Sequence, residues 1–224
     1  MAVIEPIRRD IEHPRQIKKN SAPLRFWHWA NTIVISGSLI TVLINSTITN
    51  TWQVSALIKD QVQQSGVSLT DAQARAGAHA LNDKVWDIHV YFGYCLAGLL
   101  LFRLLLEFFQ VADQKFIRKI KSAYTQYNDI KKNREIARHE LVVKLLYSAF
   151  YILLIIMALT GLSLAFEGIA FLKPYRHSIR SVHGFCMYLI LAFIAVHLAG
   201  VFLAERKDSA GIVSDMINGG KEEN

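Results

Sequence analysis

Long runs of apolar residues alternate with polar stretches along this 224-residue chain. Four apolar blocks approach the length that crosses a bilayer, for which about 20 helical residues suffice. They cover residues 26–48, 85–111, 141–170 and 181–204. The third block contains LLYSAFYILLIIMALTGLSLAF, which lacks the polar face that a soluble amphipathic helix shows every 3.6 residues. The pattern therefore predicts an all-α integral membrane protein, a four-helix bundle spanning residues 21–204.

The segments between the blocks carry their own signals. Residues 50–82 form an outer loop longer than a connector needs, and Thr70-Asp71-Ala72-Gln73 fits a capping box, so we expect a short extra helix from Asp71 to Leu81. The middle loop contains KFIRKIKSAYTQY, which predicts an interfacial amphipathic helix, with a solvated basic loop as the alternative. Residues 1–20 and 205–224 are expected to be polar cytoplasmic tails.

Charge indicates the orientation of these helices. The formal net charge of +7 would favour nucleic-acid binding if the basic residues formed a solvated stripe. They gather instead before the first block and between the second and third, whereas the other two loops carry few. Because basic loops stay in the cytoplasm, we expect both termini and the middle loop there, and no nucleic-acid partner. Residues 1–20 lack the apolar region of a cleavable signal peptide, so we expect the first block to direct insertion.

Histidines interrupt the apolar blocks. His183 and His197 lie fourteen residues apart in the last block, which puts them about 40° apart around one helix and about 21 Å apart along it. An ionisable side chain inside a spanning helix is costly, and it suggests a function. His28 near the start of the first block has two readings, since it could also belong to an interfacial aromatic belt with Trp27 and Trp29.

The expected orientation sorts the histidines by depth. His28 and His197 fall near the cytoplasmic face, whereas His89, in the second block, and His183 fall near the outer face. Two facing imidazoles suit the axial positions of a haem iron, whereas zinc needs three or four ligands and the chain lacks Cys, Asp or Glu nearby to supply them. No CxxCH motif is present, so we predict two haem b groups without thioether bonds.

Other residues of the spanning blocks and their ends suit the same sites. Gly93 follows His89 by one turn and removes a side chain where a broad group would sit. The haem propionates need cationic partners, and the candidates are Arg25 and Lys144 at the inner mouth and Arg176 and Arg180 at the outer mouth. Arg103 either reaches back to the cytoplasmic surface or meets an anionic group in the bundle.

Several motifs together resemble a known family. APLRFWHW in the first block, HVYFG in the second, the spacing of His183 and His197, and the closing ERKDSAGIVSDMINGG are similar to the bacterial four-helix di-haem cytochrome b family. That family includes the cytochrome b subunits of membrane-bound nickel–iron hydrogenases and respiratory formate dehydrogenases. The likeness covers roughly residues 21–220 and is closest to the hydrogenase type.

The resemblance implies that His28, His89, His183 and His197 match the family's axial ligands. It also implies a multi-pass protein of the bacterial inner membrane. Electrons would arrive from a periplasmic hydrogenase-like dehydrogenase through an iron–sulfur subunit, cross from the outer to the inner haem, and reduce a quinone. The chain would then be an electron-transfer subunit rather than a catalyst alone.

Two other functions remain open from the sequence. One is a free-standing quinol oxidase that passes electrons to a small acceptor such as superoxide at the outer face. The other is a transporter or scaffold whose histidines relay protons or pack, although the internal repeat that many transporters show is not visible in the sequence.

Overall fold

A computed structural model describes residues 22–109, 134–166, 168–207 and 211–218, together with residues 120, 121, 124, 125 and 127. Every regular element among these residues is helical. Four of the helices are long and apolar enough to cross a membrane. The chain is therefore an all-α, multi-pass membrane protein, as its hydropathy predicts.

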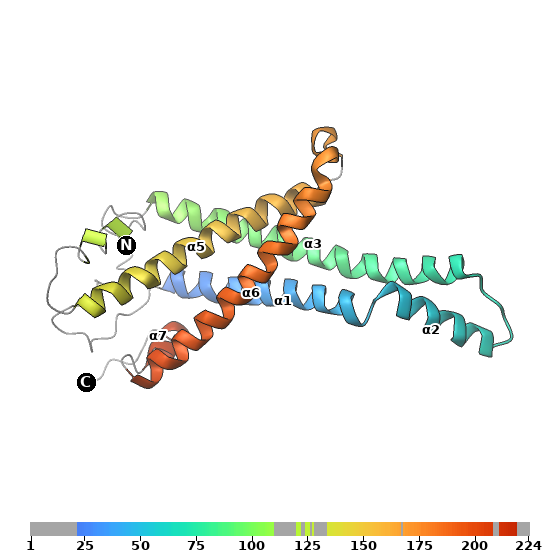
Figure 1. The fold of residues 1–224 in the computed structure, drawn as a ribbon, viewed down its shortest axis with the longest axis horizontal. Helices are drawn as coiled ribbons and strands as arrows, with labels where there is room; N and C mark the ends of the chain where they lie inside the picture. The colour runs from blue at the N-terminus through green and yellow to red at the C-terminus, as the bar shows by residue number, and fades with distance from the viewer. Residues whose placement is uncertain are drawn as a thin grey trace. The chain divides into compact units, whose positions relative to one another are not determined.

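The elements follow one another along the chain in Figure 1. They are α1 (Ala22–Thr47), α2 (Thr51–Gln64), α3 (Asp71–Phe109), α5 (Arg134–Ala165), the 3-10 helix η2 (Ala170–Tyr175), α6 (Arg176–Lys207) and α7 (Ile212–Asn218). The four predicted apolar blocks fall on α1, α3, α5 and α6. The third block ends earlier than predicted, at Ala165, because a turn at Gly168 and the proline-containing η2 follow.

The short helix of the outer loop lies at a different place from the one predicted. The capping box is present, because the Gln73 amide donates to Thr70 Oγ1 over 3.3 Å and the Thr70 amide donates to Gln73 Oε1 over 3.0 Å. The helix that begins there does not end at Leu81, since no glycine or proline lies between Leu81 and the apolar block, and it continues as α3. The short extra helix of this loop is α2, capped by the Asn50 side chain.

The prediction of an interfacial helix in the middle loop falls largely outside the described residues. Residues 120, 121, 124, 125 and 127 are helical. The N-terminal tail also lies outside them. The C-terminal segment is not only a polar tail, because residues 212–218 form α7.

The chain divides into two compact units. The first unit comprises residues 30–98. In it, Asn82 of α3 donates to Asn45 Oδ1, in the last turn of α1, over 3.1 Å and to the Thr49 carbonyl, just after α1, over 3.3 Å. Gly37 lets the two helices approach closely, since a β-carbon there would lie 2.4 Å from the ring of Phe92.

The second unit comprises residues 1–29 and 99–224. Its core lies between α5 and α6, where Leu154, Ala158, Cys186 and Ile190 are buried. The chain after α6 folds back through Glu205, whose carboxylate accepts from the Gly211 and Val213 amides over 2.8 Å and 3.2 Å. These bonds position α7 against the end of α6.

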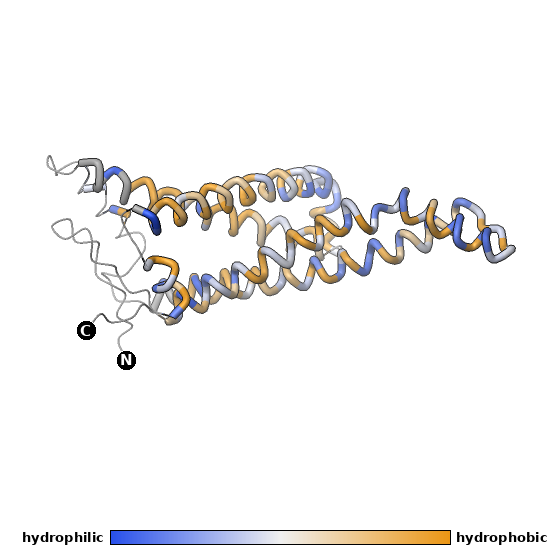
Figure 2. Tube along the Cα trace, turned by 90° about the horizontal axis from the view of Figure 1, so that it is seen from below, coloured by the Kyte–Doolittle hydropathy of each residue, from blue (hydrophilic) through white to orange (hydrophobic). Residues whose placement is uncertain are grey.

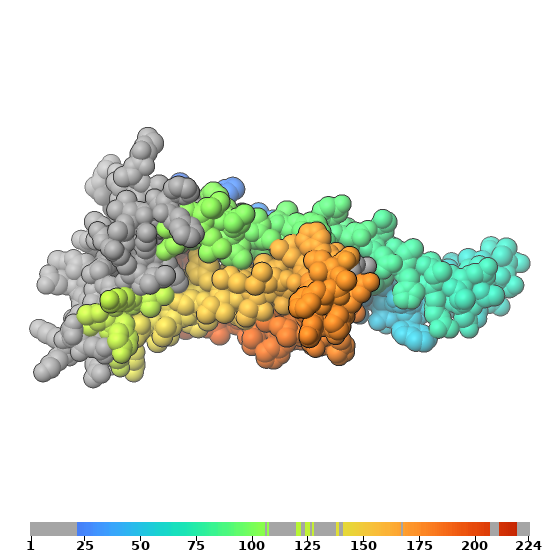
Figure 3. Space-filling view, turned by 90° about the horizontal axis from the view of Figure 1, so that it is seen from above, coloured from blue at the N-terminus to red at the C-terminus, as the bar shows by residue number. Residues whose placement is uncertain are grey.

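Large apolar side chains remain exposed along the spanning helices. Apolar positions run the length of α5 and α6 in Figure 2, and α5 is broadly exposed in the space-filling view of Figure 3. Exposed residues on α5 include Leu145, Ile152 and Leu159. In water such a surface would aggregate, but lipid tails solvate it, so the exposure agrees with a membrane location.

Candidate functional site

His28 near the start of α1 and His197 near the end of α6 lie side by side in the second unit. Their ring centroids are 6.2 Å apart and the ring planes are inclined by 53°. Both side chains are half-buried. Two imidazoles at this separation are too far apart to stack on each other. They are close enough for both to bind one metal ion placed between them.

This separation matches a metal ion bound from both sides. Imidazole nitrogens bind transition metals at about 2 Å and the ring centre lies about 1.2 Å farther back, so two opposed ligands have centroids about 6.4 Å apart. Among the described residues, no group of three or more His, Cys, Asp or Glu is placed to hold a metal. The pair therefore suits an ion whose remaining ligands come from a prosthetic group.

His89 lies in the first unit and is held through one ring nitrogen. Its Nδ1 is 2.9 Å from Thr41 Oγ1 and 3.3 Å from the Ser38 carbonyl oxygen. A carbonyl oxygen only accepts, and the Thr41 hydroxyl already donates to that same carbonyl over 2.6 Å. Nδ1 must therefore carry the proton, which leaves the lone pair of the neutral ring on Nε2.

His183 of α6, in the second unit, is held in the same way. Its Nδ1 is 2.9 Å from Thr160 Oγ1, and that hydroxyl donates to the Ile156 carbonyl over 2.6 Å. Nδ1 therefore donates to Thr160, and the lone pair is again on Nε2. Gly161 leaves space for the ring, because a β-carbon there would lie 3.2 Å from Cε1 of His183.

Comparison with known proteins identifies the family of the chain. The family model described as prokaryotic cytochrome b561 matches residues 19–219. The chain belongs to the prokaryotic cytochrome b561 family. Comparisons with curated proteins and with solved structures found no match. As a member of its family, the chain is a membrane cytochrome b that binds haem b and transfers electrons.

The four predicted ligand histidines of this cytochrome b can now be placed. The structure brings His28 and His197 together, whereas His89 and His183 are each described within a separate unit. The separation of the first pair and the Nδ1–H tautomer of the other two all fit haem iron as the bound metal. Their roles as axial ligands remain predictions.

Aromatic side chains surround the His28–His197 pair. The His197 ring is parallel to Phe193 within 7°, with centroids 5.9 Å apart, and Phe193 stacks on Phe150 at 4.4 Å. Trp29 meets His28 edge-on at 5.4 Å. These rings give the pair apolar neighbours, with Phe150 and Phe193 contributed by α5 and α6.

A polar cluster occupies the same unit. Arg103 is only 9 % exposed, and its Nε donates to the Tyr151 hydroxyl over 3.1 Å while Nη1 lies 3.5 Å from Glu107. The Tyr151 ring stacks on Trp27, the neighbour of His28 in sequence. Of the two alternatives for Arg103, the structure therefore supports the pairing with an anionic group.

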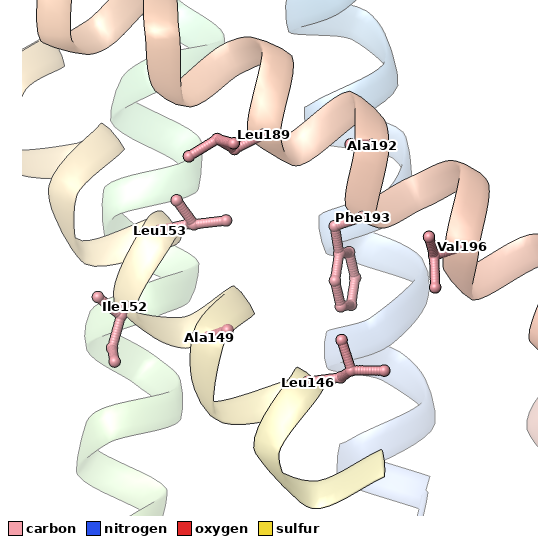
Figure 4. A pocket seen from close by; sticks show the side chains of 8 residues that line it. All are labelled: Leu146, Ala149, Ile152, Leu153, Leu189, Ala192, Phe193 and Val196. Atoms are coloured by element: carbon pink, nitrogen blue, oxygen red, sulfur yellow. The ribbon is translucent and has the colours of Figure 1, made fainter. Parts of the chain in front are cut away.

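An open apolar groove lies between α5 and α6 (Figure 4). It has a volume of about 440 Å³. Its walls are formed by Leu146, Ala149, Ile152, Leu153, Leu189, Ala192, Phe193 and Val196. Phe193 thus has one side on the groove and stacks on His197.

The remaining predicted residues differ in their surroundings. A β-carbon at Gly93 would meet nothing within 4 Å, so space is open beside it. Arg25 is half-buried and Arg180 is exposed. Arg176 donates to the Leu164 carbonyl over 3.4 Å, which ties the start of α6 to the end of α5. The pairing of these arginines with propionates stays a prediction.

Sequence reasoning missed the roles of Thr41 and Thr160. Thr41 bonds to His89, Thr160 bonds to His183, and Gly161 makes room for the His183 ring. A signal was available in the sequence. Each threonine lies inside an apolar block at about the depth of a histidine in another spanning helix.

Proposed function

We propose that this cytochrome b carries electrons through two b-type haems between a periplasmic dehydrogenase of the hydrogenase type and the quinone pool. His28 and His197 ligate the inner haem, and His89 and His183 ligate the outer haem. The observation that carries this proposal is the 6.2 Å separation of the His28 and His197 rings. It agrees with the about 6.4 Å expected when two imidazoles share one metal.

Haem b with two imidazole ligands supplies one-electron transfer and leaves no coordination position for oxygen or substrate. The chain itself holds and shields the ligands. Thr41 and Thr160 orient His89 and His183, while Phe193 and Trp29 pack around the inner pair.

Two features support the pairing of His89 with His183: the similar membrane depth that the sequence predicts for them, and the tautomer that they share. His89 and His183 are both near the outer ends of their spanning segments, and both present an Nε2 lone pair. Gly93 leaves open space one turn after His89, as a broad planar group requires. Arg25 at the inner end and Arg180 at the outer end are proposed to bind propionates, because guanidinium groups pair well with carboxylates.

The quinone is proposed to react near the inner haem. The Arg103–Tyr151 pair supplies hydrogen-bond donors for a quinone head group. The groove between α5 and α6 has the apolar character of an isoprenoid tail, and Phe193 connects it to His197. Head group and tail would then both lie within the second unit.

The length of α3 supports a soluble partner at the outer face. Its 39 residues extend about 58 Å at 1.5 Å per residue, whereas the hydrocarbon core of a bilayer is about 30 Å thick. The start of α3 is joined to α2 by the Lys59–Asp71 ion pair of 2.6 Å. Trp52 and Leu57 of α2 and Val67, between α2 and α3, are exposed, as at a docking surface.

Histidine variants test the haem assignment. The purified protein is expected to hold about two low-spin b-type haems per chain by pyridine haemochrome assay. The double variant His28→Ala/His197→Ala should lose one haem, since both residues serve the same site. The double variant His28→Ala/His183→Ala should lose both. His79→Ala is the matched control, because His79 is an exposed histidine of α3.

A wild-type protein with one haem or none would contradict the proposal. If His28→Ala/His197→Ala lost both haems while the protein remained folded, the pairing would be wrong. Purification from native membranes tests the partner. A co-purified subunit with iron–sulfur clusters supports the relay, whereas a single chain that oxidises quinol and reduces superoxide by itself supports the free-standing alternative.

A further inference from the structure

We propose that Thr41 and Thr160 are positioning residues that lower the redox potential of the outer haem. Their hydroxyl oxygens accept hydrogen bonds from Nδ1 of His89 and His183, and this makes both imidazoles stronger electron donors. The inference rests on the proposed function, since it requires that these two histidines ligate iron.

The direction of each hydrogen bond is determined by the threonine itself. The Thr41 hydroxyl donates to the Ser38 carbonyl over 2.6 Å, and the Thr160 hydroxyl donates to the Ile156 carbonyl over 2.6 Å. A hydroxyl has one proton, so each threonine oxygen can only accept from its histidine. The bonded carbonyl also polarises the hydroxyl, which makes its oxygen a better acceptor.

This arrangement has a definite effect on a metal ligand. When an acceptor draws on the Nδ1 proton, the imidazole gains basicity at Nε2. A more basic ligand stabilises ferric over ferrous iron, and the midpoint potential falls. The same arrangement occurs independently on α1 and α3 in the first unit and on α5 and α6 in the second.

One ligand of the inner pair, His197, lies in aromatic surroundings. The described contacts of His197 are aromatic, with Phe193 parallel to its ring and Phe150 behind it. An apolar environment disfavours the additional positive charge of ferric haem and raises the potential. The lower-potential haem is therefore the outer one, and electron transfer from the outer to the inner face is downhill.

A purely structural explanation makes a different prediction. Serine and threonine inside helices often donate to a carbonyl three or four residues earlier, whatever else they contact. If that were their only role, their replacement would change stability and leave the potentials unchanged. The midpoint potential therefore separates the two explanations.

The test uses the full-length protein with both haems and equilibrium redox titration of the haem absorption bands. Thr41→Val and Thr160→Val should each raise the potential of the lower-potential haem and leave the other unchanged. Thr41→Ser and Thr160→Ser keep the hydroxyl and should titrate like the wild type. The matched controls are Thr47→Val and Ser163→Ala, which remove hydroxyls that donate to the Leu43 and Leu159 carbonyls of their own helices.

The potentials and haem contents of the threonine variants decide whether the inference holds. An unchanged lower potential in both valine variants, or a shift of the higher potential instead, overturns the inference. If one valine variant loses a haem, the potential measured in the other valine variant, which changes the second ligand of the same haem, decides the inference. Loss of the haem in both overturns it. Failure of the proposed function is distinct, because the wild-type protein would then lack the second haem before any threonine is changed.

Discussion

Gly161 offers a quantitative test of the His183 site. A β-carbon added there would lie 3.2 Å from Cε1 of His183, whereas ordinary contacts begin at 3.4 Å. In Gly161→Ala the ring must therefore move by a few tenths of an ångström. Its 2.9 Å bond to Thr160 then lengthens toward about 3.2 Å, the upper end of good N–H···O geometry.

The expected effect follows from the value of that bond. A hydrogen bond contributes about 0.5–1.5 kcal/mol, so weakening it reduces haem retention by at most about two- to thirteenfold. Gly161→Val brings two more methyl groups to the same place and should empty the site. Retention is measured as transfer of haem to an excess of a haem-scavenging protein, in a His28→Ala background that keeps only the outer haem.

Gly98→Ala is the matched control for this experiment. It gains the same helix propensity, its β-carbon would meet nothing within 4 Å, and it lies about 180° around α3 from His89. The reasoning is refuted if Gly161→Ala and Gly98→Ala retain haem equally, or if Gly161→Val binds haem like the wild type.

Three further predictions concern packing and substrate. Arg103→Met should destabilise the protein by about 1–3 kcal/mol in thermal unfolding, because Arg103 is buried, and adding Glu107→Gln should recover part of this loss. Gly37→Ala should lower the free energy of unfolding by about 1–3 kcal/mol, since its β-carbon would overlap the Phe92 ring. Adding Phe92→Leu should relieve the overlap. Equal stability of the single and double variants would contradict this. Ala192→Trp should fill the groove and raise the KM for a long-tailed quinone, while a tail-less quinone serves as the control and should react unchanged.

Local sequence signals predicted where helices begin better than where they end. The capping box at Thr70 was correct because its two hydrogen bonds involve residues only three positions apart. The end of that helix was wrong, since no stop signal separates it from the apolar block. The C-terminal α7 was missed because it depends on tertiary contacts, among them the 3.0 Å bond from the Trp29 indole to the Met216 carbonyl.

The sequence by itself determined the four spanning helices, because the length and polarity of each apolar block are set along the chain. It also predicts the depths of His28, His89, His183 and His197, since the position of a residue along a helix follows from counting residues at a constant rise. Only the tertiary structure decided which groups each ring meets. The approach of His28 to His197, and the contacts of Thr41 with His89 and of Thr160 with His183, depend on how each helix is rotated about its axis. That rotation is set by side-chain packing between helices, which no pattern along a single helix specifies.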